Sequence, residues 1–492
     1  MGAKQINNNK GITMKKMNFL AVLLGGLLSA QTTFTLVKDI YPGTQNAFPS
    51  NFTLYNGKMV FAAGSSIGNE LWESDGTEEG TKLVADILPG ASSSSPSNLF
   101  TFSNKIYFTG ARSINGANVY GVLMSYDEVN GVQTISTSAN FAANFTGLGN
   151  TLYFKATNTA VNPNTQRLFY LDDAGQPTIA DNNLNVSVIG YAPGKVIANA
   201  QLATATNVYW TQLFGFDGTT VNLVKNINPT SSSYPQNFYY SSALGKTIFN
   251  ANGGNGTEPW ITDGTEQGTY LIKDINTSNS TAGSAPSNFT EFNGKIYFSA
   301  SNGLENGPEL WVTDGTAEGT KMLKDIATGS TGSSPERMVV FKDKLYFLAT
   351  NTGNVRQLWE TDGTENGTKI VASLASASSL VVYNNQLYLS GRITNNDEVG
   401  AELYKVNLPD ANLSAATSHA PEIKVFPNPS NGEFYLSNLK SGTFELFDLT
   451  GKLVKQGNFS GGKIATSVQP GYYILKVKTS ATTVMIEKIK IQ

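Results

Sequence analysis

The strongest constraint on the fold of this chain is an internal repeat. The sequence ELWESDGTEEGTKLVADI at residues 70–87 returns as EPWITDGTEQGTYLIKDI at 258–275, as ELWVTDGTAEGTKMLKDI at 309–326 and as QLWETDGTENGTKIVASL at 357–374. Weaker copies begin near Leu123, Leu168, Leu213 and Leu403, so the unit recurs every 45 to 52 residues. A period of this length without a helical pattern is typical of the four-stranded blades of a β-propeller.

The two ends of the repeat array indicate how it closes. After Glu402 the last unit runs into residues 405–409, which contain no LVKDI-like strand, whereas residues 35–40 (TLVKDI) stand alone before the first complete unit. Placing this strand on the last unit removes the exposed sheet edges of an open array. The sequence therefore predicts an all-β fold with an eight-bladed β-propeller over 31–410, whose last blade is closed by the N-terminal strand 35–40.

The repeat resembles the ELWxxDGT repeat of exported bacterial proteins. That family is recognised by its repeat and not by a shared reaction, so the resemblance implies export and little about activity.

The N-terminal residues have the pattern of an export signal. Lys15 and Lys16 precede the apolar stretch 19–28 and the small residues Ser29 and Ala30, which predicts a signal peptide within 1–30 that is cleaved after Ala30. A ten-residue helix spans about 15 Å, half of a bilayer core, so we expect no transmembrane segment in the mature chain.

A small-residue linker over 411–421 leads to a second domain, 422–492. The segment VFPNP at 425–429, Asn431-Gly432 and the GYY at 471–473 resemble the type A sorting domain of the type IX secretion system. About seven alternating strands predict a small Ig-like β-sandwich there. The resemblance implies the type IX secretion machinery as partner and a secreted or outer cell-surface location on a Gram-negative bacterium.

Composition excludes several classes of chemistry. The chain has no cysteine and one histidine, His419, which removes disulfides, thiolate metal sites and most histidine-based catalysis. Lys plus Arg sum to 34 and Asp plus Glu to 37, for a net charge of -3, which argues against nucleic acid as a partner.

Two repeated features have a structural and a functional interpretation. Trp72, Trp260, Trp311 and Trp359 occupy one strand position, which indicates a core between blades or an aromatic platform for a sugar. The aspartates of the Asp-Gly-Thr turns indicate turn chemistry or a ligand site.

Acidic residues also recur in pairs, 16 positions apart, at the start of the third strand and the end of the fourth. The pairs are Glu70 and Asp86, Glu258 and Asp274, and Glu309 and Asp325, and the two chain ends would reproduce the pair as Glu402 and Asp39. Both acids are missing together in two units, which have Gln357 with Ser373 and Gln212 with Asn226. Neighbouring carboxylates repel unless a cation or hydrogen-bond donors stabilise them, so the pairs are candidate Ca2+ sites. The alternative is that each carboxylate separately caps loop backbone.

Asparagines follow the prolines that end the loops between units. Asn51, Asn98, Asn237 and Asn288 each come two residues after a proline, at the start of an innermost strand, and we expect them to ring one mouth of the central channel. Uncharged amides and hydroxyls suit the hydroxyl groups of a glycan, and they equally suit capping of a strand start.

The resulting prediction is a secreted or cell-surface propeller for binding and adhesion, whose ligand is a glycan or a surface protein. A glycan-active enzyme resembling a glycoside hydrolase is the alternative, and it needs two carboxylates at the channel mouth. Glu291 is the only acid inside the innermost strands, so the sequence predicts no enzyme. A purely structural surface component is a third interpretation.

Overall fold

The structure of the chain is a computed structural model that describes residues 31–409 and 425–492 with short gaps. The gaps are 159–164, 203–209, 280, 304–306, 395–397, 427–429, 437–438, 449–451 and 480–481. The predicted signal peptide, the predicted linker and His419 lie outside the described residues. The chain divides into two compact units, one of residues 30–409, hereafter the ring unit, and one that contains residues 410–492.

The ring unit consists of antiparallel sheets that follow one another in chain order. The first two sheets contain β2 (Ser50–Tyr55), β3 (Lys58–Ser65), β4 (Gly68–Ser74) and β5 (Lys82–Ala85), then β6 (Ser97–Phe102), β7 (Lys105–Ile114), β8 (Ala117–Asp127) and β9 (Gly131–Ser136). An eight-stranded sheet follows, with β10 (Ala139–Leu148), β11 (Thr151–Asn158), β12 (Gln166–Leu171), β13 (Pro177–Ile179), β14 (Leu184–Ala192), β15 (Lys195–Leu202), β16 (Gln212–Phe216) and β17 (Val221–Lys225). Its two halves are joined through β12 and β14 by one residue pair, Arg167 with Asn185.

Four more sheets complete the ring unit, each with four strands. Two contain β18 (Gln236–Ser241), β19 (Lys246–Asn252), β20 (Thr257–Thr262) and β21 (Tyr270–Leu271), then β22 (Ser287–Phe292), β23 (Lys295–Ala300), β24 (Glu309–Thr313) and β25 (Lys321–Lys324). The other two contain β26 (Glu336–Phe341), β27 (Lys344–Thr350), β28 (Arg356–Thr361) and β29 (Lys369–Ser373), then β30 (Ser376–Tyr383), β31 (Gln386–Arg392), β32 (Glu402–Asn407) and β1 (Thr33–Lys38).

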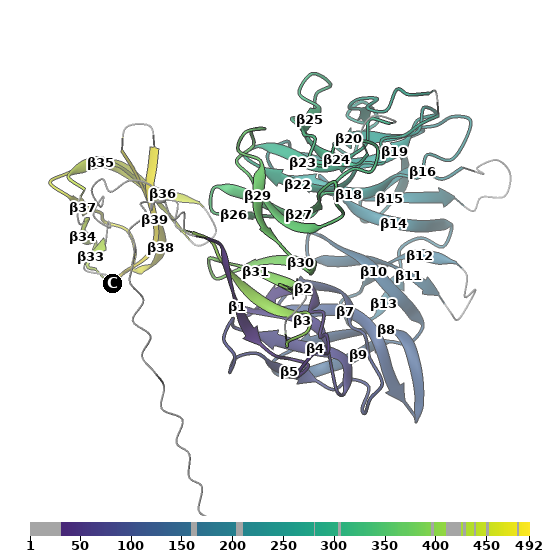
Figure 1. The fold of residues 1–492 in the computed structure, drawn as a ribbon, viewed down its shortest axis with the longest axis horizontal. Coiled ribbons are helices and arrows are strands. Elements are labelled where there is room, and N and C mark those ends of the chain that lie inside the picture. The colour runs from purple at the N-terminus through teal and green to yellow at the C-terminus, as the bar shows by residue number, and fades with distance from the viewer. Residues whose placement is uncertain are drawn as a thin grey trace, which may run out of the picture. The chain divides into compact units, whose positions relative to one another are not determined.

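The first strands of consecutive units form a closed circuit. Strands β2, β6, β10, β14, β18, β22, β26 and β30 each contact the next, and β30 contacts β2 again. Figure 1 shows the purple β1 in the same sheet as the green β30 and β31, where the ring closes. Strand β1 pairs antiparallel with β32, with Leu36 opposite Tyr404 and Thr33 opposite Asn407, so the predicted pairing of the N-terminal strand is confirmed.

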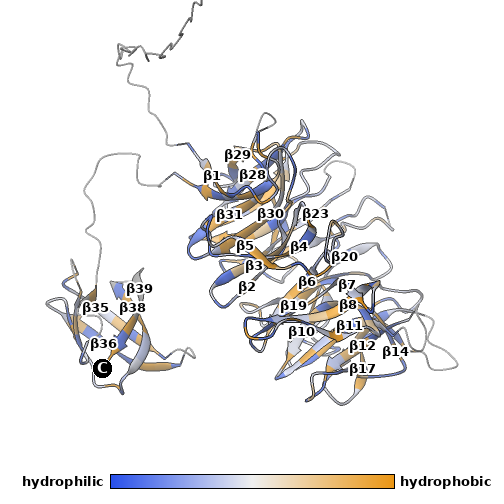
Figure 2. Ribbon diagram, turned by 90° about the horizontal axis from the view of Figure 1, so that it is seen from below, coloured by the Kyte–Doolittle hydropathy of each residue, from blue (hydrophilic) through white to orange (hydrophobic). Residues whose placement is uncertain are grey.

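Apolar side chains pack between consecutive sheets. Trp72 and Met59 pack with Tyr388 and Leu403 of the last sheet, and each of the other repeated tryptophans likewise packs against the sheet before its own. Figure 2 shows hydrophobic residues spread through all parts of the ring unit. The all-β prediction is confirmed, since the described residues contain strands and no helix.

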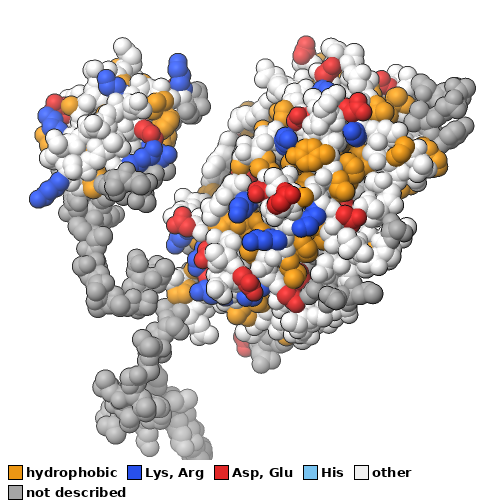
Figure 3. All heavy atoms as spheres, turned by 90° about the horizontal axis from the view of Figure 1, so that it is seen from above, with side chains coloured by type: hydrophobic (Ala, Val, Ile, Leu, Met, Phe, Trp, Pro, Cys, Tyr) orange, Lys and Arg blue, Asp and Glu red, His pale blue; other side chains and the backbone are white. Residues whose placement is uncertain are grey.

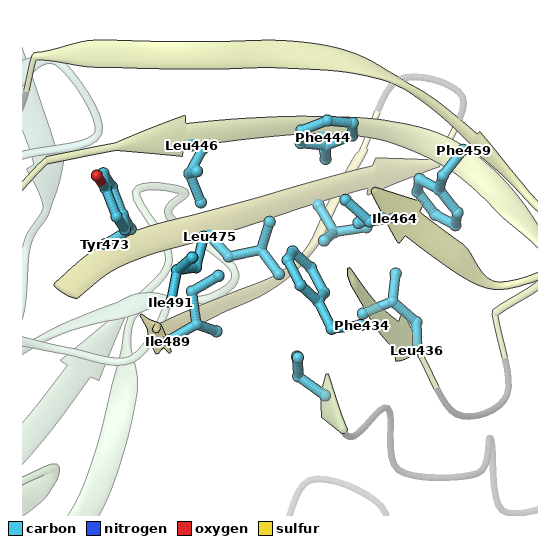
Figure 4. Close-up of a cluster of buried hydrophobic side chains, with 12 residues drawn as sticks. Phe434, Leu436, Phe444, Leu446, Phe459, Ile464, Tyr473, Leu475, Ile489 and Ile491 are labelled. Carbon is cyan, nitrogen blue, oxygen red and sulfur yellow. The ribbon is translucent and has the colours of Figure 1, made fainter. Parts of the chain in front are cut away.

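The C-terminal unit is one seven-stranded antiparallel sheet with its own core. Its strands are β33 (Val425–Phe426), β34 (Glu433–Leu436), β35 (Ser441–Phe447), β36 (Leu453–Ser460), β37 (Lys463–Ala465), β38 (Gly471–Thr479) and β39 (Thr482–Ile491). Figure 4 shows Phe434, Leu446, Leu475 and Ile489 from different strands gathered in this core. Throughout the described residues, no helix has the length and apolar character needed to cross a membrane.

Candidate functional site

The two sides of the ring unit differ in their loops. A Cβ atom added to Gly68, the first residue of β4, would meet the carbonyl oxygen of Ser92, in the connection after β5, at 2.3 Å. Gly256, between β19 and β20, lies equally close to the carbonyl oxygen of Ala282. The connections between sheets and the loops between second and third strands therefore share one side, the loop face, because alternate ends of antiparallel strands lie together. The Asn-Gly and Asp-Gly-Thr turns lie on the opposite side, the turn face.

Three buried glutamates at the start of a third strand hold the connections of the loop face. The Glu309 carboxylate accepts hydrogen bonds from the backbone N–H groups of Ile326 (2.8 Å) and Ser333 (2.9 Å) and from the Ser333 hydroxyl (2.6 Å). Glu70 accepts the equivalent hydrogen bonds from Ile87 and Ser94. Glu258 accepts them from Ile275 and Ser284. The serine belongs to the connection that enters the next sheet, so each carboxylate joins two consecutive sheets. Burial raises the pKa of all three carboxyl groups, and these hydrogen bonds partly oppose the rise.

Glu402 does the same at the closure of the ring, with weaker partners. It is fully buried and accepts the backbone N–H groups of Ile40 (3.0 Å), Ala47 (3.3 Å) and Tyr41 (3.4 Å). Ala47 stands where the other sites have a serine, so the short hydroxyl bond is missing. Burial, with a smaller contribution from the charge of Asp39, raises the pKa of Glu402 to about 7.

A neutral amide, Gln212 or Gln357, holds the same position in two units. The Gln212 carbonyl oxygen accepts the Ile227 N–H (3.0 Å) and the Ser233 hydroxyl (2.8 Å), and its Nε2 donates to the carbonyl oxygen of Asn228 at 2.8 Å. Gln357 makes a long contact of 3.4 Å from Nε2 to the Ser373 hydroxyl.

The aspartates of the predicted calcium pairs lie at the ends of the same connections. Asp39 accepts the Gly43 N–H at 3.1 Å, Asp274 accepts the Asn255 amide at 2.6 Å, and Asp86 is exposed. Asp325 occupies the equivalent position after β25. The hydrogen bonds that the glutamates accept come from loop N–H and O–H groups. The part of the chain that the structure describes contains no cluster of three or more acidic, histidine or cysteine residues suited to a metal ion.

The four predicted asparagines are exposed and lie in β-bulges of the first strands. Asn51, Asn98, Asn237 and Asn288 have φ between 55° and 58°, a left-handed conformation that asparagine tolerates well. The Asn51 amide donates to the carbonyl oxygen of Pro96 (3.4 Å) and the Asn288 amide to that of Pro335 (3.2 Å), each in the next unit. These side chains thus link neighbouring first strands along the loop face.

Sequence reasoning missed a second recurring position, which lies three residues before a left-handed asparagine. Phe48, Phe141 and Tyr234 stand there with left-handed backbones and large exposed side chains. Each lies three residues before Asn51, Asn144 or Asn237, so an alignment of the units on their left-handed asparagines would have found them.

The remaining repeated residues have structural roles. The four repeated tryptophans are 7 to 9% exposed, as expected for core residues, whereas Trp210 is 43% exposed. Asp314 accepts the Thr316 N–H (3.0 Å) and hydroxyl (2.7 Å), and these bonds hold the pKa of its carboxyl below the usual range. Glu291 accepts hydrogen bonds from Ser241 (2.9 Å) and Ser242; burial acts to raise its pKa, but the hydrogen bonds outweigh burial and hold it below the usual range.

Residues 424–492 match the family model of the secretion system C-terminal sorting domain. The chain carries a type IX sorting domain. A protein with this sorting domain is handled by the type IX secretion machinery and is secreted or held at the cell surface. No curated protein is similar enough to count as a match.

The solved structures that are similar to the chain come from peptidases. The β-propeller domain of the Trilobed protease from Pyrococcus furiosus is 12% identical, with 69% of this chain and 99% of that chain covered and a TM-score of 0.41. A prolyl endopeptidase is 10% identical, with 89% of this chain and 55% of that chain covered and a TM-score of 0.42. The acylaminoacyl peptidase of Pyrococcus horikoshii is 11% identical, with 72% of this chain and 59% of that chain covered and a TM-score of 0.40. The chain spans only 55 to 59% of the length of these two peptidases. The ring of sheets is propeller-like.

These comparisons correct the prediction that the protein is not an enzyme. The similar solved structures are those of peptidases, so the acids of the innermost strands do not suffice to exclude an enzyme, and the exclusion was wrong. The physical reason is that a fold does not fix a function, because loops and added domains supply the reacting groups.

Proposed function

We propose that this protein is a secreted or cell-surface binding and adhesion protein, whose loop face binds a glycan or another surface protein. The single observation that carries the proposal is the combination of a type IX sorting domain with a face on which four of the connections between sheets are uncharged. The loops 40–51, 87–98, 226–237 and 275–288 contain no Asp, Glu, Lys or Arg. Asn51, Asn98, Asn237 and Asn288 lie at the ends of these loops and would supply amide groups to a ligand.

The finer architecture belongs to the same proposal. We propose a signal peptide within 1–30, an eight-bladed propeller of ELWxxDGT repeats over 31–410, a linker over 411–421 and an Ig-like sorting domain over 422–492. The eight first strands that contact one another in a circuit support this blade count, with the eight-stranded sheet counted as two blades joined at Arg167 and Asn185.

A glycan array with the purified full chain tests the binding function. We expect binding to a restricted set of glycans, or binding to whole cells that a soluble glycan does not compete for, which would indicate a protein ligand. A chain that binds neither glycans nor cells would contradict the proposal.

Calcium at the paired carboxylates is a separate prediction, tested by melting curves of the full chain with added calcium or with a chelator. A shared ion would bind only the folded chain and would stabilise it by roughly 2.7 kcal/mol per site at a hundredfold excess over its dissociation constant. Asp325→Asn should then reduce the rise in melting temperature, and Gln357→Ala, in a unit without the pair, should not. Identical melting curves in calcium and in chelator would leave only the capping interpretation.

A further inference from the structure

One repeat position on the loop face is occupied by a large aromatic residue in three units and by a small residue in three others. The position lies directly before the proline or alanine that leads into a first strand, and it is occupied by Phe48, Ser95, Phe141, Tyr234, Ala285 and Ser334. In all six residues φ lies between 45° and 55°, in the left-handed region. A left-handed backbone costs a residue other than glycine roughly 1 to 2 kcal/mol, and it is an outlier for a bulky side chain.

The fold imposes this backbone whatever the side chain is. The N–H of Phe48 donates to the carbonyl oxygen of Ala401 at 3.0 Å, and the N–H of Ser95 donates to that of Asn69 at the same distance. Ser334 makes the equivalent bond to Pro308 at 2.8 Å. Since serine donates the same hydrogen bond and adopts the same φ as phenylalanine, the aromatic ring is not needed to build the connection.

Burial does not explain the aromatic residues either. The side chains of Phe48, Phe141 and Tyr234 are 50%, 55% and 55% exposed. A half-exposed ring gains only part of the stabilisation of a core residue, and the serines at 95 and 334 show that the connection forms without it. The Phe141 ring packs on Gly121, where an added Cβ atom would lie 2.7 Å from it, and the rest of this ring is exposed. Strained positions that persist without a stability gain point to function.

Further exposed aromatics stand beside two of the three. Asn140, next to Phe141, donates its amide to the carbonyl oxygen of Tyr120, which is 62% exposed. Ser233, next to Tyr234, donates its N–H to Thr211, and the residue before Thr211 is the exposed Trp210. The loop face therefore carries aromatic rings near three seams between sheets.

The surroundings of these rings are polar and uncharged. Residues 40–51, 136–144 and 226–237 contain no charged side chain, and Asn and Ser supply most of their polar groups. By contrast, Lys58, Lys105 and Lys295 follow tight turns on the turn face, and Figure 3 shows basic and acidic side chains interspersed on one face of the protein. A charged ligand beside these rings would lose hydration without gaining an opposite charge from these three segments.

We propose that the loop face binds an uncharged polysaccharide, whose sugar rings stack on Phe48, Phe141 and Tyr234. A pyranose ring presents C–H groups on its face and hydroxyl groups at its rim, which matches an aromatic ring surrounded by amides and hydroxyls. Three similar sites on one ring suit a repeating ligand, because several weak contacts with one polymer add up to strong retention. This inference rests on the proposed binding function and names its ligand class and contact residues.

Electrophoresis of the full chain through native gels that contain a polysaccharide tests the proposal. The probes are the uncharged polymers hydroxyethyl cellulose, galactomannan and laminarin, with alginate as a charged counterpart. We expect at least one uncharged polymer to retard the protein. The triple variant Phe48→Ser/Phe141→Ser/Tyr234→Ser should bind that polymer at least about tenfold more weakly.

The chain supplies matched controls. Each serine substitution copies the residue found naturally at 95 and 334, so the variants should keep the melting temperature of the wild type. Tyr270→Ser removes a 40% exposed ring from β21, outside the loop face, and should leave retardation unchanged. Ser334→Tyr should increase retardation by adding a fourth ring.

Three outcomes would overturn the inference. They are equal retardation of the triple variant and the wild type, retardation by alginate alone, and no retardation by any of the uncharged polymers. If one of these outcomes is found but the glycan array or the cell assay still shows binding, only the proposed aromatic contacts are refuted and the proposed binding function stands. If neither assay shows binding, both proposals are refuted.

Discussion

A buried carboxylate needs donors, and the four glutamates of the loop face show what one missing donor does. Glu70, Glu258 and Glu309 each receive a short bond from a serine hydroxyl, whereas Glu402 faces Ala47. Glu402 has a pKa of about 7, well above the ordinary 4.5. The difference corresponds to roughly 3 kcal/mol between the two protonation states.

The charge of Glu402 should make the stability of the protein depend on pH. Because its pKa is higher in the folded than in the unfolded chain, its contribution to stability is complete below about pH 4.5 and is lost as pH rises through about 7. Glu402→Gln, which copies Gln212, should remove this dependence and be more stable than the wild type above pH 7. Melting temperatures of both proteins between pH 4 and 8 measure the difference.

A second variant separates this effect from a general loss of packing. Ala47→Ser should supply the missing hydroxyl, lower the pKa of Glu402 and flatten the melting temperature of the otherwise unchanged chain in the same pH range. Parallel pH curves for the wild type and Glu402→Gln would show that the carboxylate does not titrate in this range.

Single residues also mark where sequence reasoning stopped. The 16-residue spacing paired each glutamate with an aspartate of its own unit, but the serine that binds Glu70 is Ser94, 24 positions away in the connection to the next unit. A spacing within one unit cannot show a partner that belongs to the next. The aromatic position was missed for a different reason, since its residues share a backbone conformation and not a side-chain type.

Among the local elements, the Asp-Gly-Thr turn is the most regular. In four copies an aspartate accepts hydrogen bonds from the N–H and the hydroxyl of the threonine two residues later. The threonine hydroxyl in turn accepts the N–H of the glycine three residues after it. A Cβ atom on Gly319 would lie 2.0 Å from a carboxylate oxygen of Asp314. The glycine is therefore part of the motif because the carboxylate occupies the space of its side chain.

The turn predicts a coupling between two substitutions. Gly319→Ala should displace the Asp314 carboxylate from its two hydrogen bonds and cost roughly 1 to 3 kcal/mol of unfolding free energy. In an Asp314→Ala background the same substitution should cost clearly less, because the clash is gone. Denaturant unfolding of the four proteins gives the coupling, and the exposed neighbour Glu318→Ala should change little. Strictly additive costs would contradict this account.

Turns and strands were the part of the fold that the sequence predicted best. Asn293-Gly294 and Asp314-Gly315 end strands in the structure as expected, because these pairs tolerate a conformation that few others do. The junction of β12 with β14 was not predicted, since it depends on one pair, Arg167 with Asn185, in a stretch where the repeat has decayed.

For the ring unit as a whole, β1 is the element that closes it. Deleting residues 33–38 exposes the backbone of β32 along its whole edge, and an unpaired edge promotes aggregation. We expect the deletion to lower the melting temperature and to increase light scattering on heating. Thr33→Ser/Thr35→Ser, which keeps the strand, should behave like the wild type. A deletion variant that stays monodisperse with an unchanged melting temperature would rule out this role of β1.

The sorting domain predicts where the protein is found. Removal of 424–492 should leave the ring unit folded but retained in the periplasm, because the type IX machinery no longer recognises the chain. Fractionation of cells with immunoblotting compares the truncated and full-length proteins, and full-length Glu402→Gln serves as an export control. Normal amounts of the truncated protein in the medium or on the cell surface would refute the role of this segment.

The pairing of β1 with β32 also sets the order in which the chain can mature. A ribosome makes β1 among the first strands and β32 more than 360 residues later; the Asn407 amide reaches back to Thr33 across 374 positions. Closing a loop of that length costs roughly 5 kcal/mol of chain entropy, so the contact forms only after the intervening sheets have shortened the path. Until then the earliest strand has no partner, and resistance to proteases should therefore appear abruptly and late in synthesis.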